Sequence, residues 1–116
     1  MAREAGKEDG RHQAYSEVLS LLGESGSRTF ETPLGKIEVS NIGGDRILID
    51  VDLLARPGET REMGNALSVS IYVTPNGPER PKTNTMIVGG DNKLELFSRV
   101  EEITFDNVMA TLREQK

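Results

Sequence analysis

The chain of 116 residues contains no cysteine and no tryptophan, and it has one histidine, His12. The lack of cysteine excludes disulfides and thiolate metal ligands, and a single histidine cannot form a zinc site of the usual kind. Aromatic residues make up only 4% of the chain, so the core must consist mainly of aliphatic side chains. Few aromatic platforms for base stacking and a net charge of −5 argue against nucleic-acid binding.

Long apolar segments are also missing. No run approaches the roughly 20 apolar residues that span a bilayer, and residues 1–10 lack the apolar core of a signal peptide. We therefore expect no membrane association and a cytoplasmic location. Residues 1–10 are small and charged and are expected to form a disordered arm, whereas residues 11–116 fit a single domain.

Amphipathic helices are predicted at both ends of this domain. Apolar residues recur with the spacing i, i+3, i+4, i+7 between Arg11 and Leu22, and Gly23 is placed to end that helix. The same spacing from Phe105 to Leu112 predicts a second helix with Thr104 as its N-cap. Residues 99–103 are expected to be extended.

Alternating polar and apolar residues predict about six strands between the two helices. These strands are a short one at Phe30, then Lys36–Asn41, Arg46–Leu54, Ala66–Val73, Thr85–Val88 and Lys93–Phe97. Because only turns and loops separate them, we expect an antiparallel meander. The predicted fold class is therefore α+β, with two layers: the meander, flanked by an N-terminal and a C-terminal amphipathic helix. Residues 55–65 and 74–84 are predicted to be long loops.

The runs at 46–54 and 66–73 are the most strand-like and are expected to form the central pair. Upstream of them, Gly43 and Gly44 indicate a hairpin turn. Its register should keep apolar side chains on one face, since a shift by one residue moves every side chain to the wrong face. A loop with a bulge satisfies this condition. It pairs Val39 with Ile47, Ile37 with Ile49, and Lys36 with Asp50.

Asp50 and Asp52 are the most suggestive pair of ionisable residues. They point the same way from one strand, and Glu38 on the neighbouring strand could join them as ligands of a hard cation. Such sites normally need more oxygen ligands than these three, so the ordinary polar face of a half-buried strand is the favoured interpretation. No nucleophile is positioned beside His12, and no phosphate-binding loop is present. We predict no catalytic residue and no cofactor.

Apolar and basic residues in unexpected places provide the candidates for interaction. Leu48, Leu54 and Tyr72 interrupt the polar face of the sheet, which indicates that a helix, a loop or a second subunit covers it. The two long loops contribute further candidates: Arg56, Arg61, Pro75, Pro78, Arg80 and Pro81. The spacing of the prolines favours an extended, polyproline-like course, either as a stiff surface loop or as an arm that contacts a partner.

These observations favour a non-enzymatic protein-interaction module that acts as a homodimer or on a protein partner. One alternative is a small-ligand carrier or minor enzyme, with a cavity between the curved sheet and the N-terminal helix. The other alternative is a weak divalent-cation site at Asp50 and Asp52.

Overall fold

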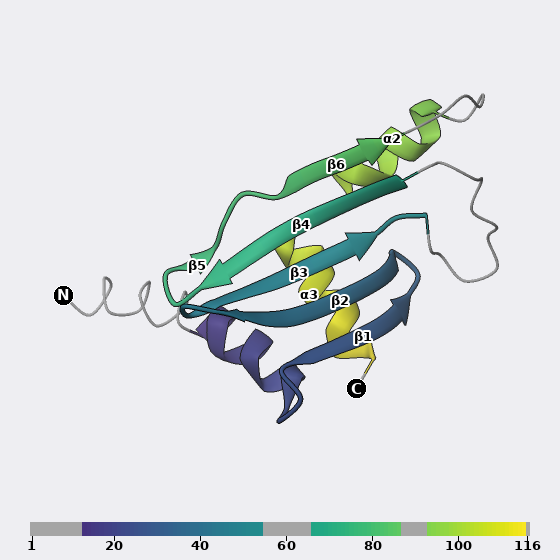
Figure 1. Ribbon diagram of the computed structural model, residues 1–116. Helices are drawn as coiled ribbons and strands as arrows, with labels where there is room; N and C mark the ends of the chain where they lie inside the picture. The colour runs from purple at the N-terminus through teal and green to yellow at the C-terminus, as the bar shows by residue number, and fades with distance from the viewer. Residues whose placement is uncertain (1–12, 55–65, 87–92, 116) are drawn as a thin grey trace.

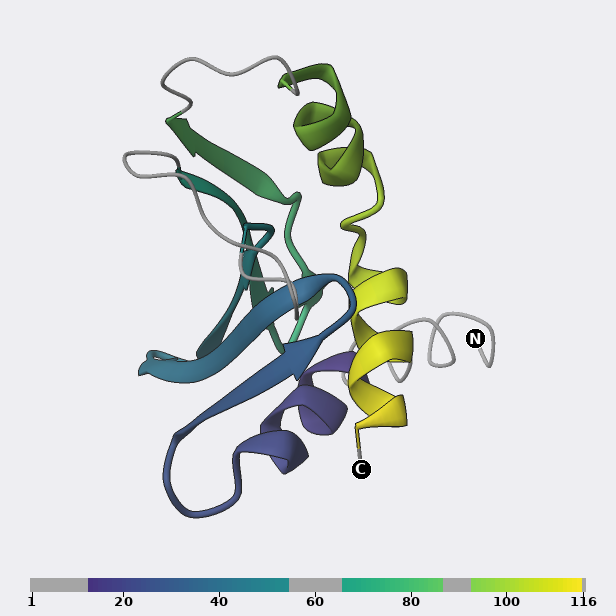
Figure 2. The same cartoon turned by 90° about the vertical axis from the view of Figure 1, so that its right-hand side faces the viewer.

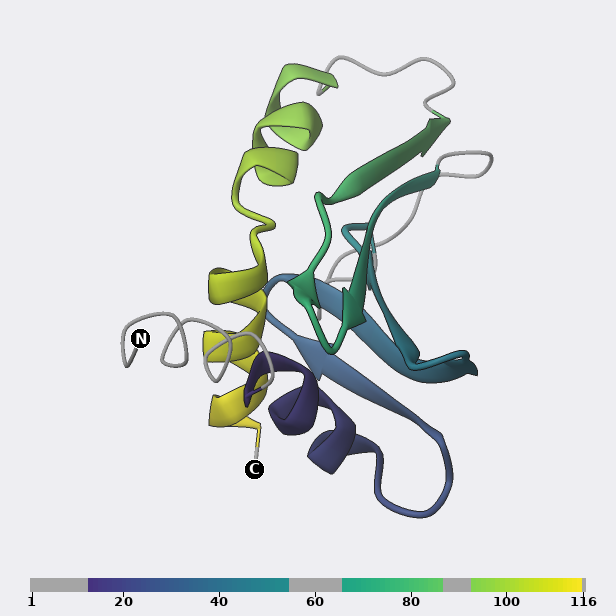
Figure 3. The same cartoon turned by 90° about the vertical axis from the view of Figure 1, so that its left-hand side faces the viewer.

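The computed structural model describes residues 13–54, 66–86 and 93–115. Within these residues, six strands form one antiparallel sheet, and three helices lie on one of its faces (Figures 1, 2 and 3). The predicted α+β fold is therefore confirmed. The helices are the N-terminal helix over 13–22, α2 (Lys93–Glu101) and α3 (Phe105–Glu114). The strands are β1 (Ser27–Thr32), β2 (Gly35–Gly43), β3 (Arg46–Asp52), β4 (Ala66–Thr74), β5 (Gly77–Pro78) and β6 (Lys82–Met86).

The predicted central pair is confirmed. Strands β3 and β4 are antiparallel neighbours, with Ile49 opposite Ile71. The sheet order is β1-β2-β3-β4, and both β5 and β6 then pair with β4. Strand β5 lies beside the C-terminal end of β4, and β6 lies beside its N-terminal half (Figure 1). The predicted arm at 1–10, the loop at 55–65 and His12 lie outside the described residues.

The hairpin between β2 and β3 contains the expected bulge, but the predicted register is wrong by two residues. Gly44 and Asp45 form a two-residue turn with φ of 63° and 58°, as a type I′ turn requires. Gly43, at φ 85°, adjoins a bulge between Asn41 and Gly43 that inserts one further residue. The resulting register pairs Ile37 with Val51, Val39 with Ile49, Glu38 with Asp50, and Lys36 with Asp52.

The predicted strand at Lys93–Phe97 is wrong, because these residues begin helix α2. Residues 99–101, which were expected to be extended, continue the same helix. Lys, Leu and Glu favour helix over strand, and Glu95 and Arg99 form an i,i+4 pair at 3.6 Å. The Arg99 guanidinium also donates to the backbone oxygen of Leu53 at 3.3 Å, which ties α2 to the end of β3.

The other helix predictions are confirmed. The Thr104 hydroxyl accepts a hydrogen bond from the Asn107 amide at 3.1 Å and so caps α3. Gly23 follows the N-terminal helix with φ 60°, the left-handed conformation that ends many helices. Among the described residues, no helix is long and apolar enough to cross a membrane.

The predicted long loop at 74–84 is wrong, since it contains β5 and the start of β6. Thr74 closes a tight turn in which its hydroxyl accepts from Asn76 N–H and donates to the oxygen of Gly77. Thr32 makes the same two bonds, to Leu34 N–H and the oxygen of Gly35. Both turns have the sequence Thr-Pro-x-Gly. Because the turn at Thr74 reverses the chain, the residues after it run back along β4 and do not follow the expected polyproline-like course.

The core lies between the sheet and the helices. It contains aliphatic residues from alternate positions of β2, β3 and β4, together with apolar residues of the N-terminal helix and α3. Leu54 belongs to this core, because the chain turns after Asp52 and both Leu53 and Leu54 become buried. Its predicted place on the polar face is therefore wrong.

Candidate interaction surface

The outer face of the sheet, defined as the face opposite the three described helices, is not covered by any of them (Figures 2 and 3). Alternation along the strands places polar side chains on this face. In β3 and β4 these side chains are half-buried, whereas the intervening core residues are fully buried. Within residues 13–54, 66–86 and 93–115, the outer face is therefore the more accessible face of the central strands.

A shallow hollow of about 170 Å³ lies on this face and is lined by Lys36, Glu38, Asp50 and Asp52. The register places Glu38 opposite Asp50 and Lys36 opposite Asp52. The predicted pairing of Asp50 with Lys36 is thus wrong, and Asp50 instead faces Glu38 on one side and Ser70 on the other. We call Glu38, Asp50 and Asp52 the acidic cluster.

Two contacts determine the chemistry of the acidic cluster. The Ser70 hydroxyl donates to Asp50 Oδ1 at 3.0 Å, and the Leu54 amide donates to Asp52 Oδ1 at 3.1 Å. Burial raises the pKa of Asp50 above its ordinary value, and the charges of Asp52 and Glu38 raise it further, whereas the bond from Ser70 lowers it. The Asp50 carboxyl is therefore more easily protonated than an ordinary aspartate.

The same geometry gives little support to a cation site. Within residues 13–54, 66–86 and 93–115, no group of three or more histidine, cysteine, aspartate or glutamate side chains could hold a metal ion. Lys36 occupies one side of the hollow, and Asp52 already accepts a backbone hydrogen bond. A hard cation normally takes about six or more oxygen ligands, so water would have to complete the coordination that these three carboxylates begin.

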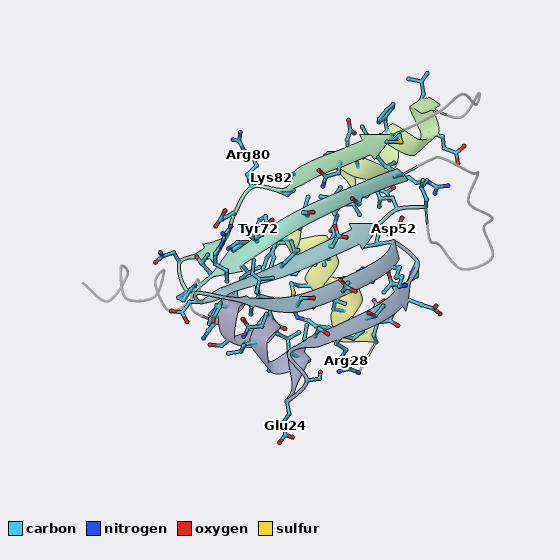
Figure 4. The ribbon with its side chains drawn as sticks, in the orientation of Figure 1. Glu24, Arg28, Asp52, Tyr72, Arg80 and Lys82 are labelled. Carbon is cyan, nitrogen blue, oxygen red and sulfur yellow. The ribbon has the colours of Figure 1, made fainter. Side chains whose placement is uncertain are left out.

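A second group of side chains surrounds Tyr72 on β4. The guanidinium carbon of Arg46 lies 4.5 Å from the centre of the Tyr72 ring, and the Lys82 ammonium nitrogen lies 5.5 Å from it. Both contacts are within the range of cation–π attraction. Figure 4 looks onto this face and shows Tyr72 near Lys82, with Asp52 farther along the sheet. Glu79 lies 4.0 Å from Arg46. We call Arg46 and Lys82 the basic cluster.

An uncharged boundary separates the two clusters. Along β3 the outer-face residues run Arg46, Leu48, Asp50, so the charge changes sign at Leu48. Across the sheet, Asp50 is opposite Ser70, and Ser70 is opposite Lys82, so the charge changes sign again at Ser70. Leu48 is half-buried and lies directly opposite Tyr72.

The structure places the predicted interaction residues at different sites. Leu48 and Tyr72 are brought together on the outer face, whereas Leu54 is in the core. Arg56 and Arg61 lie outside the described residues. The other four predicted residues lie between the end of β4 and the start of β6. Pro75 is in the turn, Pro78 is in β5, and the exposed residues Arg80 and Pro81 lie between β5 and β6. Arg80 projects beyond the edge of the sheet (Figure 4).

Sequence reasoning did not identify Arg46, Ser70 and Lys82 as site residues. Arg46 could have been found, because it precedes Leu48 by two positions and so points to the same face. Lys82 carried no such signal, since its place beside Tyr72 depends on the pairing of β6 with β4.

Comparisons with known proteins add no functional information. The chain matches no protein-family model, and neither curated proteins nor solved structures give a significant match. A proposal of function therefore depends on the outer face alone.

Proposed function

We propose that the chain is a non-enzymatic, cytoplasmic protein-interaction module that forms a homodimer through the outer face of its sheet. The observation that supports this most strongly is the outer face, which none of the three described helices covers. On it Leu48 lies between the acidic and basic clusters and beside Tyr72, whose ring contacts both Arg46 and Lys82. An aromatic and an aliphatic side chain at the centre of a charged rim is the usual composition of a protein interface.

The alternatives receive less support from the geometry. The hollow at the acidic cluster is lined by charged residues and lies on the opposite side of the sheet from the N-terminal helix. It is therefore not the apolar cavity that a small-ligand carrier needs. Ser70 donates to the Asp50 carboxylate rather than to an imidazole, and a carboxylate is a weaker base than the imidazole that activates the serine of a triad.

The oligomeric state is the direct test of this proposal. We expect light scattering after size exclusion, and sedimentation equilibrium, to give twice the 12.7 kDa mass of one chain at high micromolar concentration. Leu48→Glu places a charge at the centre of the outer face and should weaken the dimer about tenfold or more. Ala110→Glu, on the exposed side of α3, makes the same charge change elsewhere and should leave the dimer unchanged.

Three outcomes would contradict the proposal. A single chain at every concentration would exclude the homodimer. A dimer that Leu48→Glu leaves intact would place the interface elsewhere. Equal weakening by both variants would show that added charge, rather than the outer face, is responsible. Far-UV circular dichroism of each variant identifies any loss of folding.

A further inference from the structure

The distribution of charge on the outer face indicates how two copies would meet. We infer that a second copy of this chain binds across a two-fold axis that follows the boundary from Leu48 to Ser70. In this arrangement the acidic cluster of each copy faces the basic cluster of the other. The inference rests on the proposed function, because it specifies the geometry of that self-association.

Charge complementarity is the main argument for a second copy as the partner. A two-fold axis lying in the interface brings residue i of one copy against residue j of the other, and j against i. On the outer face, the acidic cluster lies on one side of the boundary and the basic cluster lies on the other. Rotation about the boundary therefore superposes opposite charges at both contacts. A partner needs this reversed pattern, and a rotated copy of the same face provides it.

The minority charges within each cluster do not reverse its sign. Lys36 stands among the three carboxylates Glu38, Asp50 and Asp52, which leaves that side negative. Glu79 lies 4.0 Å from Arg46, and Lys82 then leaves the other side positive. Because the chain as a whole carries a net charge of −5, two copies repel each other in most orientations. Segregated clusters select the orientation in which attraction exceeds this repulsion.

The residues on the boundary suit a two-fold axis. A side chain on the axis meets its own copy, and two like charges in contact would be unfavourable. Leu48 is apolar and Ser70 is small and uncharged, so neither creates that conflict. Two copies of Leu48, flanked by the Tyr72 rings that lie opposite them in the sheet, would form the apolar centre of the interface.

Variants in which both sides of the boundary carry the same net sign of charge test this geometry. In the first, Glu38→Lys with Asp50→Asn leaves Asp52 as the remaining carboxylate of the acidic cluster, beside Lys36 and the new lysine, so that this side becomes net positive. In the second, Arg46→Glu with Lys82→Glu reverses the basic cluster. Each variant alone should dimerise about tenfold more weakly than the wild type or worse, because like charges then face each other. An equimolar mixture should form heterodimers in native mass spectrometry, because both contacts again join opposite charges.

The outcomes separate this inference from the proposed function. A wild-type dimer whose variants self-associate normally, or whose mixture shows no preference for heterodimers, would overturn the charge-matched geometry and leave self-association standing. A wild-type protein that is monomeric throughout would overturn both.

A cross-linking experiment gives an independent measurement, since the chain has no native cysteine. Leu48→Cys places a thiol on the proposed axis, so mild oxidation should produce covalent dimers. Thr85→Cys is the matched control: it is exposed on β6 and, opposite Leu67, points to the other side of the sheet. Rapid cross-linking through Thr85→Cys and not Leu48→Cys would show that sheet edges pair instead. Equally slow cross-linking of both would indicate random collision and would also overturn the inference.

Discussion

Gly35 should tolerate substitution less well than Gly23, Gly26, Gly43 and Gly44, which also have positive φ but open space where a Cβ would lie. It is buried where β2 begins, at φ 133°, and a Cβ built on it would lie 2.1 Å from the backbone oxygen of Asp52. A strained backbone conformation destabilises by about 1–3 kcal/mol by itself. Because the backbone fixes the position of a Cβ, and the Asp52 oxygen is itself a backbone atom, the clash can be relieved only by moving β2 away from the end of β3. We expect Gly35→Ala to lower the free energy of unfolding by about 3–5 kcal/mol in total.

Gly23→Ala is the matched control for this prediction. Gly23 also has positive φ, at 60°, but a Cβ there would meet nothing within 4 Å, so only the left-handed backbone is penalised, by about 1–2 kcal/mol. Urea unfolding followed by circular dichroism should show the difference as a shift in midpoint with the same slope. In a thermal scan, Gly35→Ala should melt roughly 12–20 °C lower than the wild type. Equal losses for the two variants would refute the argument from the Asp52 contact.

Three further substitutions test other parts of the structure. Asp50→Asn should raise the free energy of unfolding near neutral pH. Because the pKa of Asp50 is raised in the native state, ionisation of this carboxyl lowers the free energy of unfolding as pH rises through that pKa. In urea titrations the variant should therefore be no more stable than the wild type below pH 3.8, the ordinary pKa of aspartate. An advantage independent of pH would contradict this. Thr104→Ala should lower the free energy of unfolding by about 1 kcal/mol, because the Thr104 hydroxyl caps α3. Thr104→Ser keeps a hydroxyl and should lower the free energy of unfolding much less. Equal losses for the two variants would argue against the cap. Ile49→Ala should lose about 2–5 kcal/mol, whereas Leu94→Ala, at a residue 87% exposed, should change stability by less than about 0.5 kcal/mol. A large loss at Leu94 would show that α2 packs differently.

The candidate surface divides into a part that local patterns could predict and a part that they could not. Leu48 was placed on the polar face by strand alternation, and Tyr72 was placed there in the same way. Their adjacency follows once β3 and β4 are paired. The cations beside Tyr72 could not be predicted, since Lys82 reaches it only because β6 returns along β4.

Two errors in the fold have a common physical origin, which is that a local pattern was compatible with two structures. In the β2–β3 hairpin, a shift by two residues keeps every side chain on the same face, so Val39 satisfies the pattern opposite either Ile47 or Ile49. At Lys93–Phe97, five residues alternate like a strand but also fit a helix, and such short apolar runs are ambiguous. The contact of Arg99 with the end of β3 is consistent with the helix that forms.

The sequence by itself determined which face of the two central strands is buried, where the long apolar stripes form helices, and the N-cap of α3. These properties depend on side chains only a few positions apart. The spacing of apolar residues in 104–112 therefore predicts a capped helix, and the alternation in 46–52 predicts a strand with one buried face. Only the tertiary structure decided the register of β2 against β3, and hence that Asp50 faces Glu38 rather than Lys36. It also decided that the acidic cluster and the basic cluster lie on opposite sides of Leu48 and Ser70. Register and cross-strand neighbours depend on a bulge and on strand pairings between distant segments, where the local alternatives differ little in energy.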